Sequence, residues 1–210
     1  MPVIGLFGAT GKTGRLVLER ALEAGHQVRA LVRDPAKLTI TSDRLVVVTG
    51  EVLDAESVDQ TVRGTEVVLS LFGQVRGSPK TLQTDGTRLI VESMLRHDVK
   101  RLVTLSGGAL RDEHDRPKVA DRMIMFLLKV MAGHVLADAE GHLAILQASG
   151  LDWTVVRAPR IFDAPGTGSY RVGWVGVGTS TRISHADLAD FILTQIDDRT
   201  YDQQMPFVSA

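Results

Sequence analysis

Residues 3–14 read VIGLFGATGKTG, and this stretch decides the fold. Its first half is an apolar run without polar alternation, which is typical of a parallel strand covered on both faces. A glycine-rich turn follows, and from residue 13 onward apolar side chains recur at helical spacing. A strand, a turn and a helix in this order predict that phosphate groups bind at the helix N-terminus.

The residues of this loop share one expected task, the binding of a dinucleotide pyrophosphate. Its glycines can make the turn, admit the backbone close to the ligand, and let the helix pack near the strand. Hydroxyl and ammonium side chains can add donors. The predicted contacts are Gly8, Thr10, Gly11, Lys12, Thr13 and Gly14.

The run Gly11-Lys12-Thr13 also invites comparison with the phosphate loop of nucleoside triphosphatases. That motif requires a glycine five residues before Gly11, where this chain has Leu6. The spacing therefore excludes a nucleoside triphosphatase loop.

Strand and helix patterns alternate from the first residues to about residue 160. Strands are expected at 3–7, 27–32, 45–49, 66–71, 101–106 and 153–158, and helices at 13–24, 54–62 and 80–97. Such alternation implies right-handed crossovers and a parallel sheet. We therefore predict an α/β fold, a doubly wound Rossmann-type sheet with helices on both faces, formed by residues 1–210 as a single domain.

Residues 111–149 depart from this alternation. A charged stretch is followed by two expected apolar helices, 119–131 and 137–149, placed after the fifth strand. There they can cap a substrate pocket. Alternatively, Met123, Ile124, Leu127 and Leu128 pack on the sheet or on a second subunit, so a monomer and a homodimer both remain open.

The composition narrows the class of protein. The chain has 210 residues, 44% of them hydrophobic and 23% charged, as in ordinary globular domains. A net charge of −1 leaves no basic footprint for nucleic acid. The absence of cysteine, of a signal-peptide pattern and of a membrane-length apolar run favours a cytoplasmic protein that binds no membrane. The histidines show no metal-ligand spacing, so no metal is expected.

The end of the second expected strand indicates which dinucleotide binds. An arginine at this point can bind the 2′-phosphate of NADP, whereas an acidic residue binds the ribose hydroxyls of NAD. Arg33 comes first after the strand, and Lys37 follows one turn later. We therefore predict NADP(H), held by Arg33 and Lys37. Asp34 would serve NAD(H) in the alternative, less favoured interpretation.

With these residues the sequence resembles the atypical short-chain dehydrogenase/reductase group with NAD(P)H-binding, NmrA-like folds. That group includes biliverdin-IXβ/flavin reductase and bacterial NADH-flavin reductase-like proteins. The resemblance covers essentially the whole chain and is carried by FGATG with TG at residues 7–14, LVRD at 31–34, GEVL at 50–53, SGL at 149–151 and ISHADL at 183–188.

The resemblance implies further cofactor contacts around the sheet edge. Residues beside the adenine, its ribose, the pyrophosphate and the two sides of the nicotinamide are, in chain order, Glu51, Val52, Leu71, Phe72, Gly73, Ser106, Gly107, Pro159, Arg160 and Ile161. Two positions depart from the group. Glu51 stands where aspartate is frequent, and Arg160 stands where the flavin reductase has histidine, so its substrate preference does not carry over.

Ordinary short-chain dehydrogenases use a Tyr-x-x-x-Lys acid. Here Tyr170 and Tyr201 are followed four residues later by Trp174 and Met205. Carbonyl reduction needs a positioned proton donor, whereas a flavin or quinone can take its proton from solvent. The sequence therefore favours a conjugated hydride acceptor over a carbonyl substrate.

The candidate catalytic residue is Ser106, as a hydrogen-bond donor to the carboxamide or the acceptor. Its hydroxyl could equally satisfy local backbone groups. Arg160, Tyr170 and Trp174 are candidate acceptor contacts. A solvated or salt-bridged loop arginine would also explain Arg160, and a surface hairpin would also explain the two aromatic residues. The segment Ser184-His185-Ala186-Asp187 is typical of a helix capping box.

Two functions follow from these observations. The first is an NADPH-dependent oxidoreductase that passes a hydride to a flavin, a quinone or a similar small-molecule acceptor. The second is a non-catalytic NAD(P)-binding redox sensor of the NmrA type. The absence of the Tyr-x-x-x-Lys pair is compatible with this function, because a sensor needs no proton donor.

Overall fold

The computed structural model describes the backbone of residues 1–210 and the side chains of all of them except residues 120, 121 and 124–131. The strands are β1 (Val3–Phe7), β2 (Gln27–Val32), β3 (Leu45–Thr49), β4 (Val67–Ser70), β5 (Arg101–Gly107), β6 (Asp152–Ala158), β7 (Arg160–Phe162), β8 (Arg171–Gly173), β9 (Arg182–Ser184) and β10 (Phe207–Ser209). The helices are α1 (Lys12–Glu23), α2 (Ala55–Val62), α3 (Leu82–Arg96), α4 (Val119–Ala148) and α5 (His185–Thr194).

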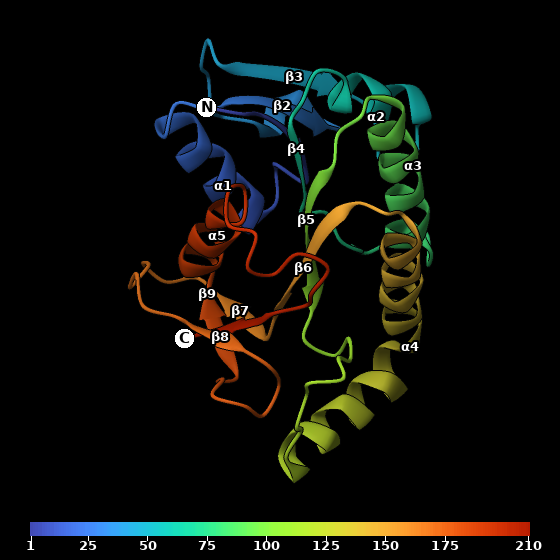
Figure 1. Cartoon of the computed structure of the whole chain (residues 1–210), viewed down its shortest axis with the longest axis vertical. Coiled ribbons are helices and arrows are strands. Elements are labelled where there is room, and N and C mark those ends of the chain that lie inside the picture. The colour runs from blue at the N-terminus through green and yellow to red at the C-terminus, as the bar shows by residue number, and fades with distance from the viewer.

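The main sheet has eight strands in the order β3-β2-β1-β4-β5-β6-β10-β8 (Figure 1). The strands from β3 to β6 pair in parallel, and so do β6 and β10, whereas β8 runs antiparallel to β10. The strand order reverses beside β1, at the point where Rossmann folds bind their ligand. The predicted α/β, doubly wound class is confirmed.

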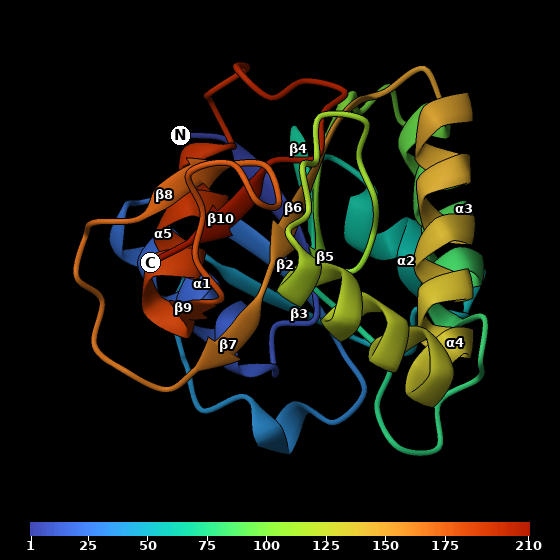
Figure 2. The ribbon, with the colours of Figure 1, turned by 90° about the horizontal axis from the view of Figure 1, so that it is seen from below.

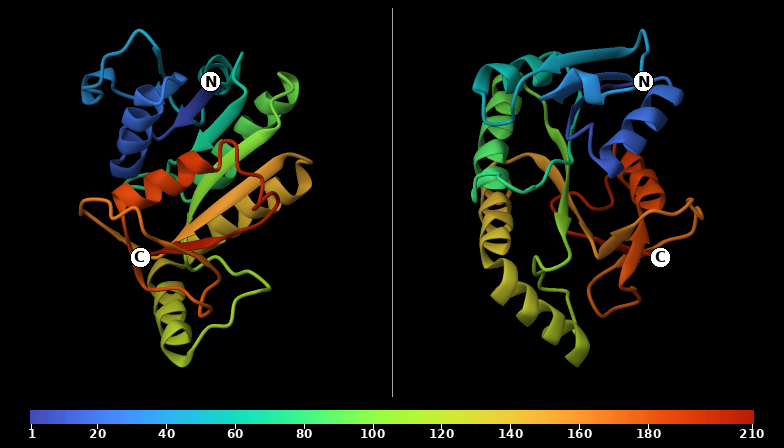
Figure 3. Two further views of the ribbon diagram at one scale, coloured as in Figure 1. Left: turned by 60° about the vertical axis from the view of Figure 1, so that its left-hand side comes forward. Right: turned by 180° about the vertical axis from the view of Figure 1, so that it is seen from behind.

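Helices cover both faces of the sheet and form two apolar cores. On one face, Val17 and Leu18 of α1 pack with Leu188 and Ile192 of α5. On the other face, α2, α3 and α4 supply a second core that includes Met94 and Leu146. Figure 3 shows α5 lying against α1 on its side of the sheet.

The expected elements agree closely with the structure as far as β6. Two helices follow the fifth strand, as predicted. Within α4 they meet at a kink at Ala132, whose φ of −138° and ψ of 37° are not helical. The second helix begins before residue 137, because only this one residue interrupts the helical backbone. Ile124, Leu127 and Leu128, for which both capping and subunit contacts were open, lie outside the described side chains.

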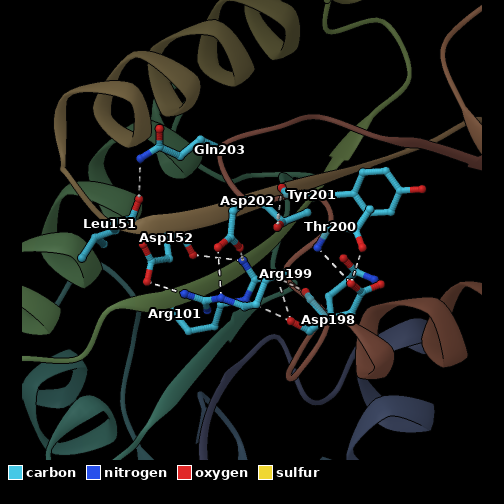
Figure 4. Close-up of polar contacts among 11 residues, drawn as sticks. Arg101, Leu151, Asp152, Asp198, Arg199, Thr200, Tyr201, Asp202 and Gln203 are labelled. Carbon is cyan, nitrogen blue, oxygen red and sulfur yellow. Dashed lines mark hydrogen bonds and ion pairs between the residues drawn. The ribbon is translucent and has the colours of Figure 1, made fainter.

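A polar cluster fixes the sheet at the end away from the glycine-rich loop (Figure 4). Arg101, at the start of β5, is 4% exposed, donates to the Gln195 carbonyl oxygen at 2.7 and 2.9 Å, and pairs with Asp202 at 2.8 Å. Arg199 bridges Asp202 and Asp152. These bonds tie the chain after α5 to the starts of β5 and β6, which makes the cluster part of the scaffold.

In the part of the chain whose side chains are described, no helix combines the length and the apolar character that crossing a membrane requires.

Candidate dinucleotide and acceptor sites

A pocket of about 340 Å³ lies at the carboxyl ends of β1, β2 and β4, the edge where the strand order reverses. It is lined by predicted cofactor contacts from four separate segments: Gly8, Thr10, Arg33, Glu51, Val52, Phe72 and Gly73. Parallel strands bring their carboxyl ends to one edge, so residues far apart in sequence meet here. The lining is that expected for the adenosine half of a dinucleotide.

The phosphate loop is too tightly built for side chains at two of its glycines. Gly8 has a φ of +88°, and a Cβ there would lie 2.7 Å from the Leu71 carbonyl carbon. A Cβ on Gly14 would lie 2.1 Å from the Gly8 oxygen. The turn therefore requires glycine at both positions, so that the first turn of α1 packs directly on β1.

The N-terminus of α1 is open to an anion. No side chain caps it, and its first turn carries no acidic residue. The first N–H groups of a helix have no partner within the helix, and the helix dipole favours negative charge there. The close approach of backbone at Gly8 and Gly14, together with these N–H groups, has the shape and polarity that would suit a pyrophosphate.

A larger cavity of about 810 Å³ lies at the ends of β5 and β6, next to the first pocket. Leu82 lines the smaller pocket and Gln83 the larger, so the start of α3 separates them. The described walls are mostly apolar and come from β5, β6, β7, β10, α3, α4 and the loops between them. The lining residues are Gln83, Ser106, Gly107, Gly108, Ala109, Leu110, Lys118, Ala132, Val135, Leu136, Ala139, Ala158, Pro159, Arg160, Val175, Gly176, Thr179, Ser180, Thr181 and Phe207. In Figure 2, α4 lies on one side of β5 and β6, and β7 to β9 lie on the other.

Ser106 lies in this cavity at the end of β5. The residue is 5% exposed, and its Oγ is buried without a hydrogen-bond partner among the described residues. The alternative from the sequence, a hydroxyl satisfied by local backbone, is therefore not what the structure shows. A buried hydroxyl without a hydrogen-bond partner lowers stability. Because Ser106 also lines the cavity, it is a candidate for a hydrogen bond with a bound ligand.

Cationic and hydroxyl side chains complete the rim of the cavity. Within the described part of the chain, the guanidinium of Arg160 makes neither an ion pair nor a hydrogen bond. Thr181 and Arg160 both line the same space. Among the described residues Arg160 has no salt bridge, and it is exposed, which agrees with the solvated alternative and also leaves its guanidinium accessible to an anionic group.

A buried ion pair holds the two loops that wall the cavity. Arg157 of β6 is fully buried and binds both carboxylate oxygens of Asp115, at 2.7 and 2.9 Å. It also donates to the carbonyl oxygens of Leu110 and Met205, each at 2.8 Å. Asp115 in turn accepts from the N–H of Val175 at 2.9 Å. Burial alone would raise the pKa of Asp115, but these hydrogen bonds outweigh it and lower that pKa.

Three predicted contacts lie elsewhere. Tyr170 does not line the cavity, because its ring packs edge-on against Phe191 at 5.8 Å, and burial raises its pKa. Trp174 stacks on His114 with ring centroids 4.7 Å apart and is not among the residues that line the cavity. Lys37 lies outside the smaller pocket, with Nζ 3.8 Å from the Asp34 carboxylate.

The remaining predicted contacts take several different positions in the structure. Leu71 and Ile161 are partly buried against the core shared by α1 and α5 and line neither pocket. Lys12 forms an ion pair with Asp163, and the hydroxyl of Thr13 lies 2.7 Å from Nδ1 of His185. Pro159 and Gly107, which the resemblance assigns to the nicotinamide, line the larger cavity.

Sequence reasoning missed several lining residues. Arg76 joins Arg33 in the smaller pocket, and it also has no polar partner among the described residues. Phe207 reaches the larger cavity from β10, near the end of the sequence. A lone arginine in a loop and a three-residue strand carry no periodic signal, so only the fold brings them to the sites.

The capping segment at α5 is confirmed with a different inner contact. Ser184 Oγ accepts from the Asp187 N–H at 2.9 Å, as an N-cap does. Asp187, however, accepts from the Ser184 hydroxyl and from the N–H groups of Thr167 and Gly168, instead of returning to the Ser184 backbone. The carboxylate is used to fix the neighbouring loop.

Comparison with known proteins agrees with this geometry. The uncharacterized protein YwnB of Bacillus subtilis (strain 168) is 26% identical over 202 residues, covering 92% of each chain. Eugenol synthase 1 of Petunia hybrida is 32% identical over 145 residues, covering 65% of this chain and 44% of its own length.

Solved structures share the fold over nearly the whole chain. A short-chain dehydrogenase/reductase from Veillonella parvula DSM 2008, in complex with NADP, has a TM-score of 0.85 at 17% identity and covers 100% of this chain and 95% of its own. ChuY, an anaerobillin reductase from Escherichia coli O157:H7, has a TM-score of 0.78 at 21% identity, with coverage of 100% and 97%. A family model described as NAD(P)H-binding matches residues 8–199, and the chain belongs to that family.

Proposed function

We propose that the chain is an NADPH-dependent reductase that passes a hydride to a flat, conjugated acceptor such as a flavin or a quinone. The observation that carries this proposal is the unpartnered, buried hydroxyl of Ser106, a residue that lines an apolar cavity of about 810 Å³ directly beside the dinucleotide pocket. A protein that only sensed the cofactor would not need a second cavity at the nicotinamide end.

The proposed roles follow from the lining. The bound cofactor supplies the hydride. Ser106 donates a hydrogen bond to the carboxamide or the acceptor, and apolar side chains such as Leu136 and Phe207 exclude water and contact a planar ring. Arg160 binds an acidic substituent of the acceptor. None of the described lining residues is a tyrosine, so the acceptor takes its proton from solvent.

Turnover tests this function. Purified protein should oxidise NADPH saturably with at least one member of a panel of FMN, riboflavin, quinones and biliverdin, measured against a blank without protein. Ser106→Ala should lower kcat/KM by about threefold to tenfold, the loss of one hydrogen bond. Ser169→Ala, an exposed serine outside both pockets, should leave it unchanged. Tight NADPH binding without any turnover would instead support the sensor.

The dinucleotide is proposed to be NADPH. The guanidinium of Arg33 lines the adenosine pocket and has no partner in the described part of the chain. Asp34, the residue that NAD would require, accepts from the Ala36 N–H at 3.1 Å and caps a short 3-10 turn, Pro35–Lys37. It does not line the pocket.

Arg33→Ala should raise the Kd of NADPH by about ten- to a hundredfold, because a charged hydrogen bond contributes about 1.5–3 kcal/mol. The Kd of NADH should change by less than about twofold, since it has no 2′-phosphate. Lys37→Ala is the matched control and should leave both constants unchanged. Equal weakening of both cofactors by Arg33→Ala would contradict the proposed preference.

A further inference from the structure

The segment after β7 approaches the phosphate loop for topological reasons. β7 and β9 pair in parallel with Phe162 opposite Ser184, so Asp163 and His185 come next at the same edge. Helix α5, which begins at His185, packs against α1 (Figure 3), where Arg20 binds the Ala186 oxygen at 2.6 Å. The pairing therefore delivers an acidic residue to the first turn of α1.

The contacts of Asp163 are with the phosphate loop itself. Its Oδ2 lies 2.5 Å from Lys12 Nζ, and its Oδ1 lies 3.8 Å from His185 Nε2. His185 Nδ1 in turn lies 2.7 Å from the Thr13 hydroxyl. The hydrogen bond from Lys12 lowers the pKa of Asp163, so its carboxylate is charged at neutral pH.

The Asp163 carboxylate lies beside the N-terminus of α1, a position that also favours the binding of an anionic ligand. The first turn of α1 has no acid of its own and no side-chain cap. The side chains of Lys12 and Asp163 are 67% and 70% exposed. An ion pair so exposed is weak and exchanges readily. A pyrophosphate at the α1 N-terminus would compete for the same ammonium group and would be repelled by the carboxylate.

We propose that Asp163 is an internal competitor at the phosphate site: it holds Lys12 in the free protein, gives it up when the pyrophosphate binds, and thereby sets cofactor affinity. The inference rests on dinucleotide binding and not on turnover or on the acceptor. Asp163 acts through Lys12 and is a determinant of affinity without being a catalytic residue.

The test is equilibrium binding without an acceptor. Asp163→Asn keeps the shape of the side chain and removes its charge, and should tighten NADPH and NADP⁺ by about two- to fivefold, the range for one charge at a helix terminus. The gain should shrink in about 1 M salt, where charges on the surface are screened. Adenosine 2′-monophosphate, which lacks the pyrophosphate, should bind as it does to the wild type.

Two further variants separate the causes. The Lys12→Met variant should by itself bind NADPH more weakly than the wild type. When Asp163→Asn is added to it, NADPH affinity should rise much less than it does in the wild-type protein. Asp190→Asn breaks another ion pair between α1 and α5, with Arg20, and should leave the Kd unchanged. Unchanged or weaker NADPH binding by Asp163→Asn would overturn the proposal, and so would an undiminished gain without Lys12. Binding with no turnover would leave this inference standing while removing the reductase function.

Discussion

Asp115→Ala should lower the free energy of unfolding by about 3–5 kcal/mol, because it leaves a buried guanidinium without its carboxylate. Arg157 is 0% exposed, so water cannot replace the lost partner. Asp115 also holds the N–H of Val175, which becomes a second unsatisfied group. Chemical denaturation followed by fluorescence of the two tryptophans would measure the change.

The matched control is an exposed pair. Glu19→Ala removes the partner of Arg15 on the surface of α1 and should change stability by less than about 0.5 kcal/mol. Because the pKa of Asp115 is lowered in the folded protein, its contribution is complete at neutral pH and is lost as the pH falls through that pKa. The difference between wild type and Asp115→Ala should therefore narrow in acid. If Asp115→Ala lowered the free energy of unfolding by less than about 1 kcal/mol at pH 7, the pair of Arg157 and Asp115 would not be a main support of the cavity walls.

Gly8→Ala should weaken NADPH binding at least about a hundredfold, the largest effect expected on the cofactor. The added Cβ would lie 2.7 Å from the backbone of Leu71 and Phe72, so the phosphate loop has to move. A loop displaced by about 1 Å no longer presents its N–H groups at hydrogen-bond distance. Isothermal titration with NADPH would measure the loss, and circular dichroism would confirm that the protein remains folded.

Gly64→Ala isolates the backbone part of this effect. Gly64 has a φ of +74°, but nothing lies within 4 Å of a Cβ placed there. This variant should therefore lose about 1 kcal/mol of stability from its backbone conformation and keep its NADPH affinity. If Gly8→Ala binds NADPH no worse than Gly64→Ala does, the cradle is not essential.

The first half of the chain could be predicted from sequence because its signals are local. The run 3–14 and the apolar strands carry their own periodicity, and the end of the second strand identified Arg33. The resemblance added Glu51, which lines the smaller pocket, and Ser106, Pro159 and Arg160, which line the larger cavity.

The second half could not be predicted in the same way. Strands β7 to β10 have three residues each, too few to show alternation. Tyr170 and Trp174 were candidate acceptor contacts because they follow the segment Pro165–Ser169, but the ring of Tyr170 packs against Phe191 and that of Trp174 stacks on His114. Asp163 gave no signal, because its partner Lys12 lies 151 positions away. Such contacts depend on tertiary structure, which a local pattern does not encode.

The position of β10 near the end of the chain affects one of the two pockets and not the other. Strand β8 joins the main sheet only through β10, which itself pairs with β6. All residues that line the smaller pocket come before Gln83, whereas Phe207 of β10 lines the larger cavity. A substitution that weakens the pairing of β10 with β6 would therefore change the wall of the larger cavity and leave the lining of the smaller pocket as it is.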